Sequence, residues 1–142
     1  MTTALPLLRA ALAAVLALAV SLPAFAQPAA AYKNGGEFYL AYRVAFEKAK
    51  SIDELLPWIA NVRREQIANA PAQEKKDGFE MIKTFDTYRD IKVVSEKPTA
   101  NGAELQVEAV SGEARQKATG TISLVKEGGA WKIDTESWQG GM

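Results

Sequence analysis

Residues 101–109 read NGAELQVEA and decide the fold. Every second residue from Leu105 to Ala109 is apolar, which predicts a β-strand with one buried and one solvated face. Asn101-Gly102 precedes this alternation and predicts a tight type I′ hairpin, because both residue types tolerate positive φ angles. The stretch therefore indicates an antiparallel strand immediately before it.

The twofold period continues on both sides of this stretch. Upstream, residues 90–97 alternate between apolar and polar side chains in the same way. Downstream, turn signals at Gly112 and Gly128-Gly129 separate a long strand from a last one over residues 131–138. The second half of the chain thus predicts four antiparallel strands in sequence order, a meander.

The preceding part of the chain has a helical period instead. Residues 37–50 carry apolar side chains at three- and four-residue spacing, which predicts a helix with one buried stripe. Ser51 and Glu54 fit a capping box, in which a hydroxyl and a carboxylate bond the free backbone amides of a helix start. A short helix is therefore expected from Ile52.

Two further helices are expected around and after Pro57. Proline fits the first turn of a helix better than its interior, so we expect a break near Leu56 and new helices over residues 58–69 and 73–88. The side chains on their apolar faces are Ile59, Val62, Ile67, Met81, Ile82, Phe85 and Tyr88. Helices followed by a consecutive antiparallel sheet predict an α+β fold, with three or four N-terminal helices packed on four strands.

The first 26 residues differ in character from the rest. Arg9 is their only charged side chain, residues 10–20 are an unbroken apolar run, and residues 24–26 read AFA. These are the three parts of a secretory signal peptide, and the run is shorter than the roughly 20 residues of a spanning helix. We expect export to the periplasm or outside the cell, with no membrane anchor. The expected divisions are a cleavable signal peptide (1–26), a flexible lead-in (27–36), one domain (37–138) and a tail (139–142).

Composition excludes several kinds of site. The chain has no His and no Cys, so thiol nucleophiles, histidine acid–base catalysis and the usual zinc, haem and iron–sulfur sites are excluded. Its 17 basic and 17 acidic side chains leave no net basic charge for a nucleic-acid interface. No phosphate-binding glycine loop or calcium-loop spacing occurs either. We expect no cofactor, no metal ion and no nucleic-acid partner.

The stretches SIDELLPWI at residues 51–59 and LVKEGGAWKI at residues 124–133 are distinctive. Together with the order of helices and meander, they resemble the NTF2-like superfamily, in particular its small exported members. The resemblance implies a cone in which helices and a curved antiparallel sheet enclose a pocket. Enzymes of this superfamily, such as ketosteroid isomerase, scytalone dehydratase and polyketide cyclases, place an Asp or His base with Tyr donors in an apolar cavity, which tunes the acids.

Only tyrosines and carboxylates remain for such chemistry in this chain. The possible groups are Tyr39, Tyr42, Tyr88, Asp86, Asp90 and Asp134, and none stands at a superfamily motif position. Tyr42 and Asp86 are the candidate catalytic pair. The alternative interpretation makes Tyr42 a core residue with a satisfied hydroxyl and Asp86 a solvated acid of a helix-to-strand junction.

Aromatic side chains form the candidate ligand-binding set. They are Phe38, Tyr42, Phe46, Trp58, Phe85 and Trp131, and they would otherwise simply fill the core. The sequence favours an exported, non-catalytic domain that binds a small apolar molecule or a protein partner. The alternative is a small isomerase, cyclase or dehydratase that uses Tyr and Asp or Glu inside the cone. A homodimer through the open sheet face is a further hypothesis, based on Val94, Val110, Thr121 and Val125.

Overall fold

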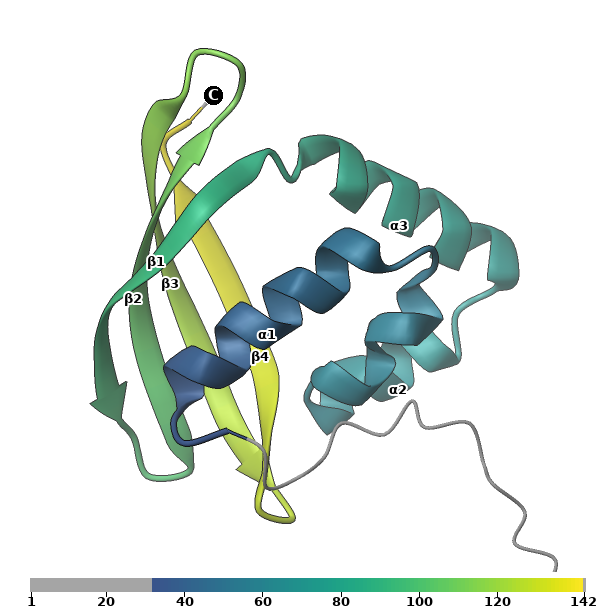
Figure 1. The fold of residues 1–142 in the computed structure, drawn as a ribbon. Coiled ribbons are helices and arrows are strands. Elements are labelled where there is room, and N and C mark those ends of the chain that lie inside the picture. The colour runs from purple at the N-terminus through teal and green to yellow at the C-terminus, as the bar shows by residue number, and fades with distance from the viewer. Residues whose placement is uncertain (1–31, 142) are drawn as a thin grey trace, which may run out of the picture.

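A computed structural model describes residues 32–141, so the predicted signal peptide and the first half of the predicted lead-in, residues 27–31, lie outside the described residues. Four helices precede four strands along the chain (Figure 1). The helices are α1 (Gly35–Lys48), the 3₁₀ helix η1 (Ile52–Trp58), α2 (Asn61–Ala68) and α3 (Ala72–Phe85). The strands are β1 (Tyr88–Pro98), β2 (Gly102–Ser111), β3 (Gln116–Glu127) and β4 (Ala130–Gln139). The α+β class is confirmed.

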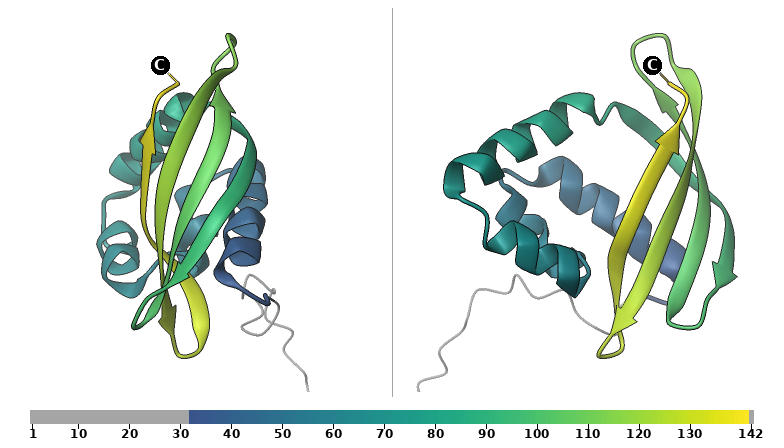
Figure 2. Two further views of the ribbon diagram at one scale, coloured as in Figure 1. Left: turned by 90° about the vertical axis from the view of Figure 1, so that its left-hand side faces the viewer. Right: turned by 180° about the vertical axis from the view of Figure 1, so that it is seen from behind.

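The four strands form one open antiparallel sheet in the order β1-β2-β3-β4, which confirms the predicted meander. The helices lie on one face of this twisted sheet, and the opposite face is left uncovered (Figure 2). Side chains from β2, β3 and β4 meet α1 and η1 in the core. The fully buried large members are Phe38, Tyr39, Leu55, Leu105, Val107, Ile122 and Leu124.

Helix α1 starts two residues earlier than its apolar stripe predicts. The Asn34 side chain accepts a hydrogen bond from the Glu37 amide at 2.9 Å, and the Glu37 carboxylate accepts one from the Lys33 amide at 3.0 Å. Asparagine is a strong N-cap residue because its side chain satisfies an amide that the helix leaves free. The helix therefore begins at Gly35, inside the segment 27–36 that composition suggests is flexible.

The region around Pro57 differs from its prediction. The short helix does start at Ile52, but Ser51 makes no capping hydrogen bond and Pro57 lies inside the helix. Backbone contacts with β4 hold the end of η1, because the Ala60 amide donates to the Ile133 carbonyl at 2.8 Å. The expected break near Leu56 is therefore wrong, and the next helix begins at residue 61 rather than 58.

The positive φ angles expected at Asn101 and Gly102 occur in a different hairpin. Asn101 and Gly102 both lack positive φ angles, whereas Gly128 and Gly129 have φ of 57° and 81° between the paired residues Glu127 and Ala130. Gly102 is required for another reason, since a Cβ at that position would overlap the carbonyl oxygen of a β3 residue. The predicted hairpin exists, but the predicted turn type is wrong.

Helix α3 packs on η1 through Phe79, which is buried. The residues expected on its apolar face are largely exposed: 58% for Met81, 45% for Ile82 and 75% for Phe85. Val62 of α2 is 74% exposed as well, while Ile59 is buried as expected. The helical layer thus presents large apolar side chains of α2 and α3 to solvent.

The uncovered sheet face is mostly polar. Val94 is 60% exposed there, whereas Val110 and Val125 are half-buried and Thr121 is exposed. The homodimer through this face stays a prediction.

Candidate functional site

A cluster of polar side chains lies buried between α1 and the end of the sheet. We call it the buried polar cluster; it consists of Tyr39 and Arg43 of α1, Asp86 after α3, and Glu136 and Trp138 of β4. Tyr39 and Arg43 are four residues apart, so they lie on one face of α1. Asp86 follows the last turn of α3, where the chain bends into β1.

Arg43 is the centre of the buried polar cluster. Its guanidinium donates to both Asp86 carboxylate oxygens, at 2.7 and 2.6 Å, and lies 3.7 Å from Glu136 Oε2. The exposed fractions of these three side chains are only 5%, 13% and 19%. Arg43 Nε is buried and has no hydrogen-bond partner among the described residues. A bidentate pair in this setting fixes both partners in one orientation.

Glu136 accepts hydrogen bonds from two aromatic side chains. The Tyr39 hydroxyl donates to Glu136 Oε2 at 3.1 Å, and the Trp138 indole nitrogen lies 3.4 Å from the same oxygen. Trp138 in turn stacks on Tyr88, with ring centroids 4.1 Å apart. The aromatic rings therefore exclude water from one side of the carboxylate.

Burial shifts the pKa values of this cluster. It raises the pKa of Glu136, although Arg43 and the hydrogen bonds from Trp138 and Tyr39 oppose the shift. Burial, together with the negative charge of Glu136, also raises the pKa of Tyr39 and of Tyr42. For Arg43, burial alone lowers the pKa, but the hydrogen bond and charge of Asp86 outweigh it and raise the pKa overall. The arginine therefore stays charged, while Glu136 holds its proton more tightly than an exposed glutamate.

The candidate catalytic residues are only partly brought together. Asp86 enters the buried polar cluster, and Tyr42 is buried beside it, within 6.1 Å of Tyr39 between ring centroids. Asp90 instead forms an exposed ion pair with Arg115 at 2.7 Å. Tyr88 lies at the rim through its stacking on Trp138, and Asp134 is half-buried on β4 outside the hydrogen bonds of the cluster.

Sequence reasoning missed Arg43 and Glu136, the two charged residues at the centre of the cluster. Glu136 was hidden by a bulge: Leu124 pairs with Ile133, but Ser123 pairs with Thr135, so β4 has one extra residue. After the extra residue, the side chains of β4 alternate in the opposite phase. Ile133 and Glu136 are three residues apart and therefore both point toward the core. A charged residue within the apolar stripe of α1 was the one signal available for Arg43.

Most of the candidate ligand-binding aromatics belong to the core or pack against it. Phe38, Tyr42 and Phe46 are 0%, 8% and 5% exposed, and Trp58 packs on Phe38 with ring centroids 5.6 Å apart. Trp131 is half-buried and stacks under the Lys126 ammonium at 4.5 Å. Phe85, the remaining member, is exposed at the end of α3.

Two hollows lie outside this packed interior, in the helical layer. The first, of about 200 Å³, is the apolar hollow; it lies between η1, α2 and α3 and is lined by Ile52, Ile67, Ala70, Glu74, Lys75, Gly78, Phe79 and Ile82. The second, of about 710 Å³, is the lysine-rimmed hollow; it is lined by Lys50, Ser51, Ile52, Asp53, Ala72, Lys75, Lys76, Phe79, Glu80, Lys83 and Thr84. Neither contains a residue of the buried polar cluster.

Within residues 32–141, no three carboxylates come close enough together to hold a metal ion. No helix of that part of the chain has the length and apolar character needed to span a membrane. Comparison with protein-family models, with curated proteins and with solved structures finds no match to this chain.

Proposed function

We propose that the protein is an exported, non-catalytic NTF2-like domain that binds a small apolar molecule in the apolar hollow of its helical layer. The observation that carries this proposal is the contrast between a filled interior and an apolar depression on the outside. Ile67 and Phe79 are directed into the core, yet they also line this hollow together with the half-exposed Ile82.

The filled interior argues against a ligand between α1 and the sheet. Trp58 packs there against Phe38 and Tyr42, at centroid distances of 5.6 and 6.1 Å. Leu105 and Ile122 from the sheet are fully buried beneath them. A ligand in this space would have to displace core side chains, and emptying a core costs about 2–5 kcal/mol per large residue.

The apolar hollow offers the opposite situation. Apart from Glu74 and Lys75 its lining is apolar, and exposing such side chains to water is unfavourable by about 25 cal/mol per Å². A small apolar molecule that covers Ile82 and Phe79 would recover part of this free energy without disturbing the core. Gly78 also lines this hollow, and a Cβ there would meet nothing within 4 Å, so the space beside it is open.

Fluorescence titration with the neutral dye N-phenyl-1-naphthylamine tests this proposal. We expect a saturable rise in dye emission with the purified protein, and loss of at least about tenfold in affinity for Ile82→Asp, which puts a charge into the hollow. Met81→Asp is the matched control, because Met81 is more exposed than its neighbour and does not line the hollow. Equal dye binding by both variants, or no dye binding at all, would overturn the proposal.

An isomerase, cyclase or dehydratase is the second candidate function, and one observation favours it. The Tyr39 hydroxyl and the Glu136 carboxylate face each other at 3.1 Å, and the pKa of Glu136 is raised, as an acid–base group requires. Turnover of a steroid-like or polyketide-like substrate that Tyr39→Phe and Glu136→Gln each abolish would establish it. Turnover that survives both substitutions, or none with the unaltered protein, would remove this candidate.

A further inference from the structure

The lysine-rimmed hollow adjoins the apolar hollow. The two share Ile52, Lys75 and Phe79 in their linings, so they lie side by side along α3. The volume of the lysine-rimmed hollow, about 710 Å³, lies within the range of roughly 300–1,000 Å³ typical of small-molecule sites. Its chemistry differs from that of its neighbour, because charged side chains surround it.

Charge in this hollow is unbalanced. Four lysines and two carboxylates line it, in a chain with equal numbers of basic and acidic residues. Lys75 is paired with Asp53 at 3.0 Å. Lys83 donates to the Phe46 and Glu47 carbonyl oxygens, at 2.7 and 3.0 Å, and so occupies the C-terminal end of α1. These contacts hold two of the ammonium groups in place.

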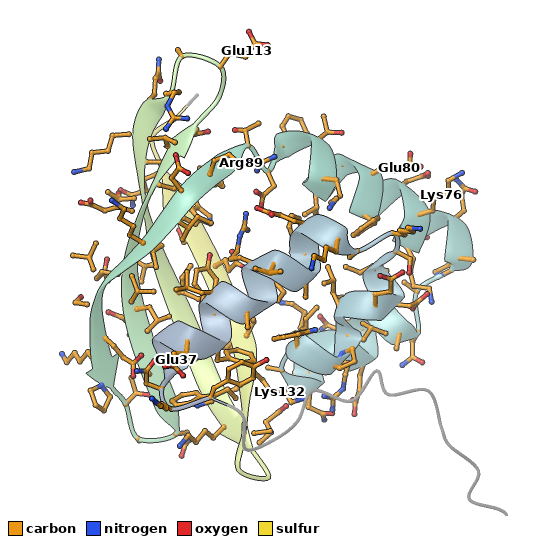
Figure 3. The ribbon with its side chains drawn as sticks, in the orientation of Figure 1. Glu37, Lys76, Glu80, Arg89, Glu113 and Lys132 are labelled. Carbon is orange, nitrogen blue, oxygen red and sulfur yellow. The ribbon has the colours of Figure 1, made fainter. Side chains whose placement is uncertain are left out.

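The other two lysines are placed differently. Lys50 and Lys76 make no ion pair within 4.0 Å in the part of the chain that the structure describes. Lys76 lies on α3 with Glu80, on the side of the molecule away from the sheet (Figure 3). Lys50 comes from the segment between α1 and η1, so the two ammonium groups approach the hollow from different elements.

We propose that the two adjoining hollows form one site for an amphipathic anion, an apolar chain ending in a carboxylate. The chain would cover Phe79 and Ile82 in the apolar hollow, and the carboxylate would lie among the ammonium groups of Lys50 and Lys76. Ser51 adds a hydroxyl donor to the same lining, whereas the Thr84 hydroxyl already donates to the Glu80 carbonyl at 2.8 Å. Charge-assisted hydrogen bonds of this kind are about twice as strong as neutral ones, so the head group sets specificity while the chain supplies apolar contact.

This inference rests on the proposed function and adds the chemical class of the ligand. Calorimetry with decanoate and with decanol, both below the concentrations at which they aggregate, separates binding of an apolar chain from recognition of its carboxylate. We expect decanoate to bind about tenfold more tightly than decanol, because only the carboxylate carries a negative charge that can pair with the ammonium groups. High salt should weaken decanoate binding and leave decanol binding unchanged.

Charge-removing variants locate the effect. The double variant Lys50→Gln/Lys76→Gln should bind decanoate no more tightly than decanol. Lys48→Gln/Lys97→Gln is the matched control, since both lysines are exposed and line neither hollow. Equal binding of decanoate and decanol by the unaltered protein, or a preference for decanoate that survives in the first double variant, would overturn the anion claim while dye binding still supported the proposed function. Absence of binding by the dye and by both probes would overturn both.

Discussion

Two arginine–aspartate pairs show how burial changes the role of the same contact. Arg43 and Asp86 are 2.6 Å apart, with side chains 5% and 13% exposed. Arg115 and Asp90 are 2.7 Å apart, with side chains 66% and 61% exposed. Removing one partner of a buried pair leaves an uncompensated charge in the interior, whereas water screens the exposed pair.

We therefore expect Arg43→Ala to lower the free energy of unfolding by about 3–5 kcal/mol. Arg115→Ala, the matched control, should lower it by less than about 1 kcal/mol. Urea denaturation followed by tryptophan fluorescence measures both. Similar losses for the two variants would show that the buried polar cluster does not depend on its arginine.

Glu136 makes stability depend on pH in a definite direction. Its pKa is raised above the ordinary value of a glutamate, mainly by burial, so the folded protein holds this proton more tightly than the unfolded chain. Protonated Glu136 therefore makes its full contribution to the free energy of unfolding below that value. The contribution is lost as pH rises through the pKa of the folded state. Relative to Glu136→Gln, which has no such proton, the unaltered protein should lose stability over the pH range above about 4.3. A constant difference in the free energy of unfolding across this range would contradict the assignment.

Strands were predictable from the sequence more fully than the turns and bulges between them. Alternation at Leu105 and Val107 fixes which face of β2 is buried, and the structure confirms it with both side chains at most 1% exposed. The bulge that turns Glu136 inward leaves no such pattern, because a single extra residue in β4 changes the face. For this reason the sequence pattern did not indicate that Glu136 belongs to the buried polar cluster.

Gly102 and Gly78 should respond in opposite ways to substitution by alanine. Gly102→Ala should destabilise the protein by at least about 1–3 kcal/mol, because its new methyl group would overlap backbone of β3. Gly78→Ala should stabilise it by about 0.5–1 kcal/mol, since Gly78 lies in a helix with open space around it. Thermal denaturation of both variants provides the measurement, and opposite signs are expected. A stable Gly102→Ala variant would contradict the close approach of β2 and β3.

The whole molecule shows why helical periodicity alone misplaced the apolar face of α3. An apolar stripe predicts that something covers Met81, Ile82 and Phe85, but the sequence does not say whether the cover belongs to the same chain. In the structure α3 contacts η1 through Phe79, and the rest of its stripe faces solvent. The α+β class and strand order were thus predictable, whereas the position of the hollows depends on how α3 packs beside η1 and α2.

The central claim is that ligands bind to the helical layer and leave the interior between α1 and the sheet undisturbed. Backbone amide chemical shifts, recorded by NMR during titration with decanoate, test it most directly. We expect the largest shifts at Ile52, Lys75 and Phe79, which both hollows share, and little change at Leu105 and Ile122 in the buried sheet face. Shifts concentrated at Leu105 and Ile122 would place the ligand in the interior and contradict the account.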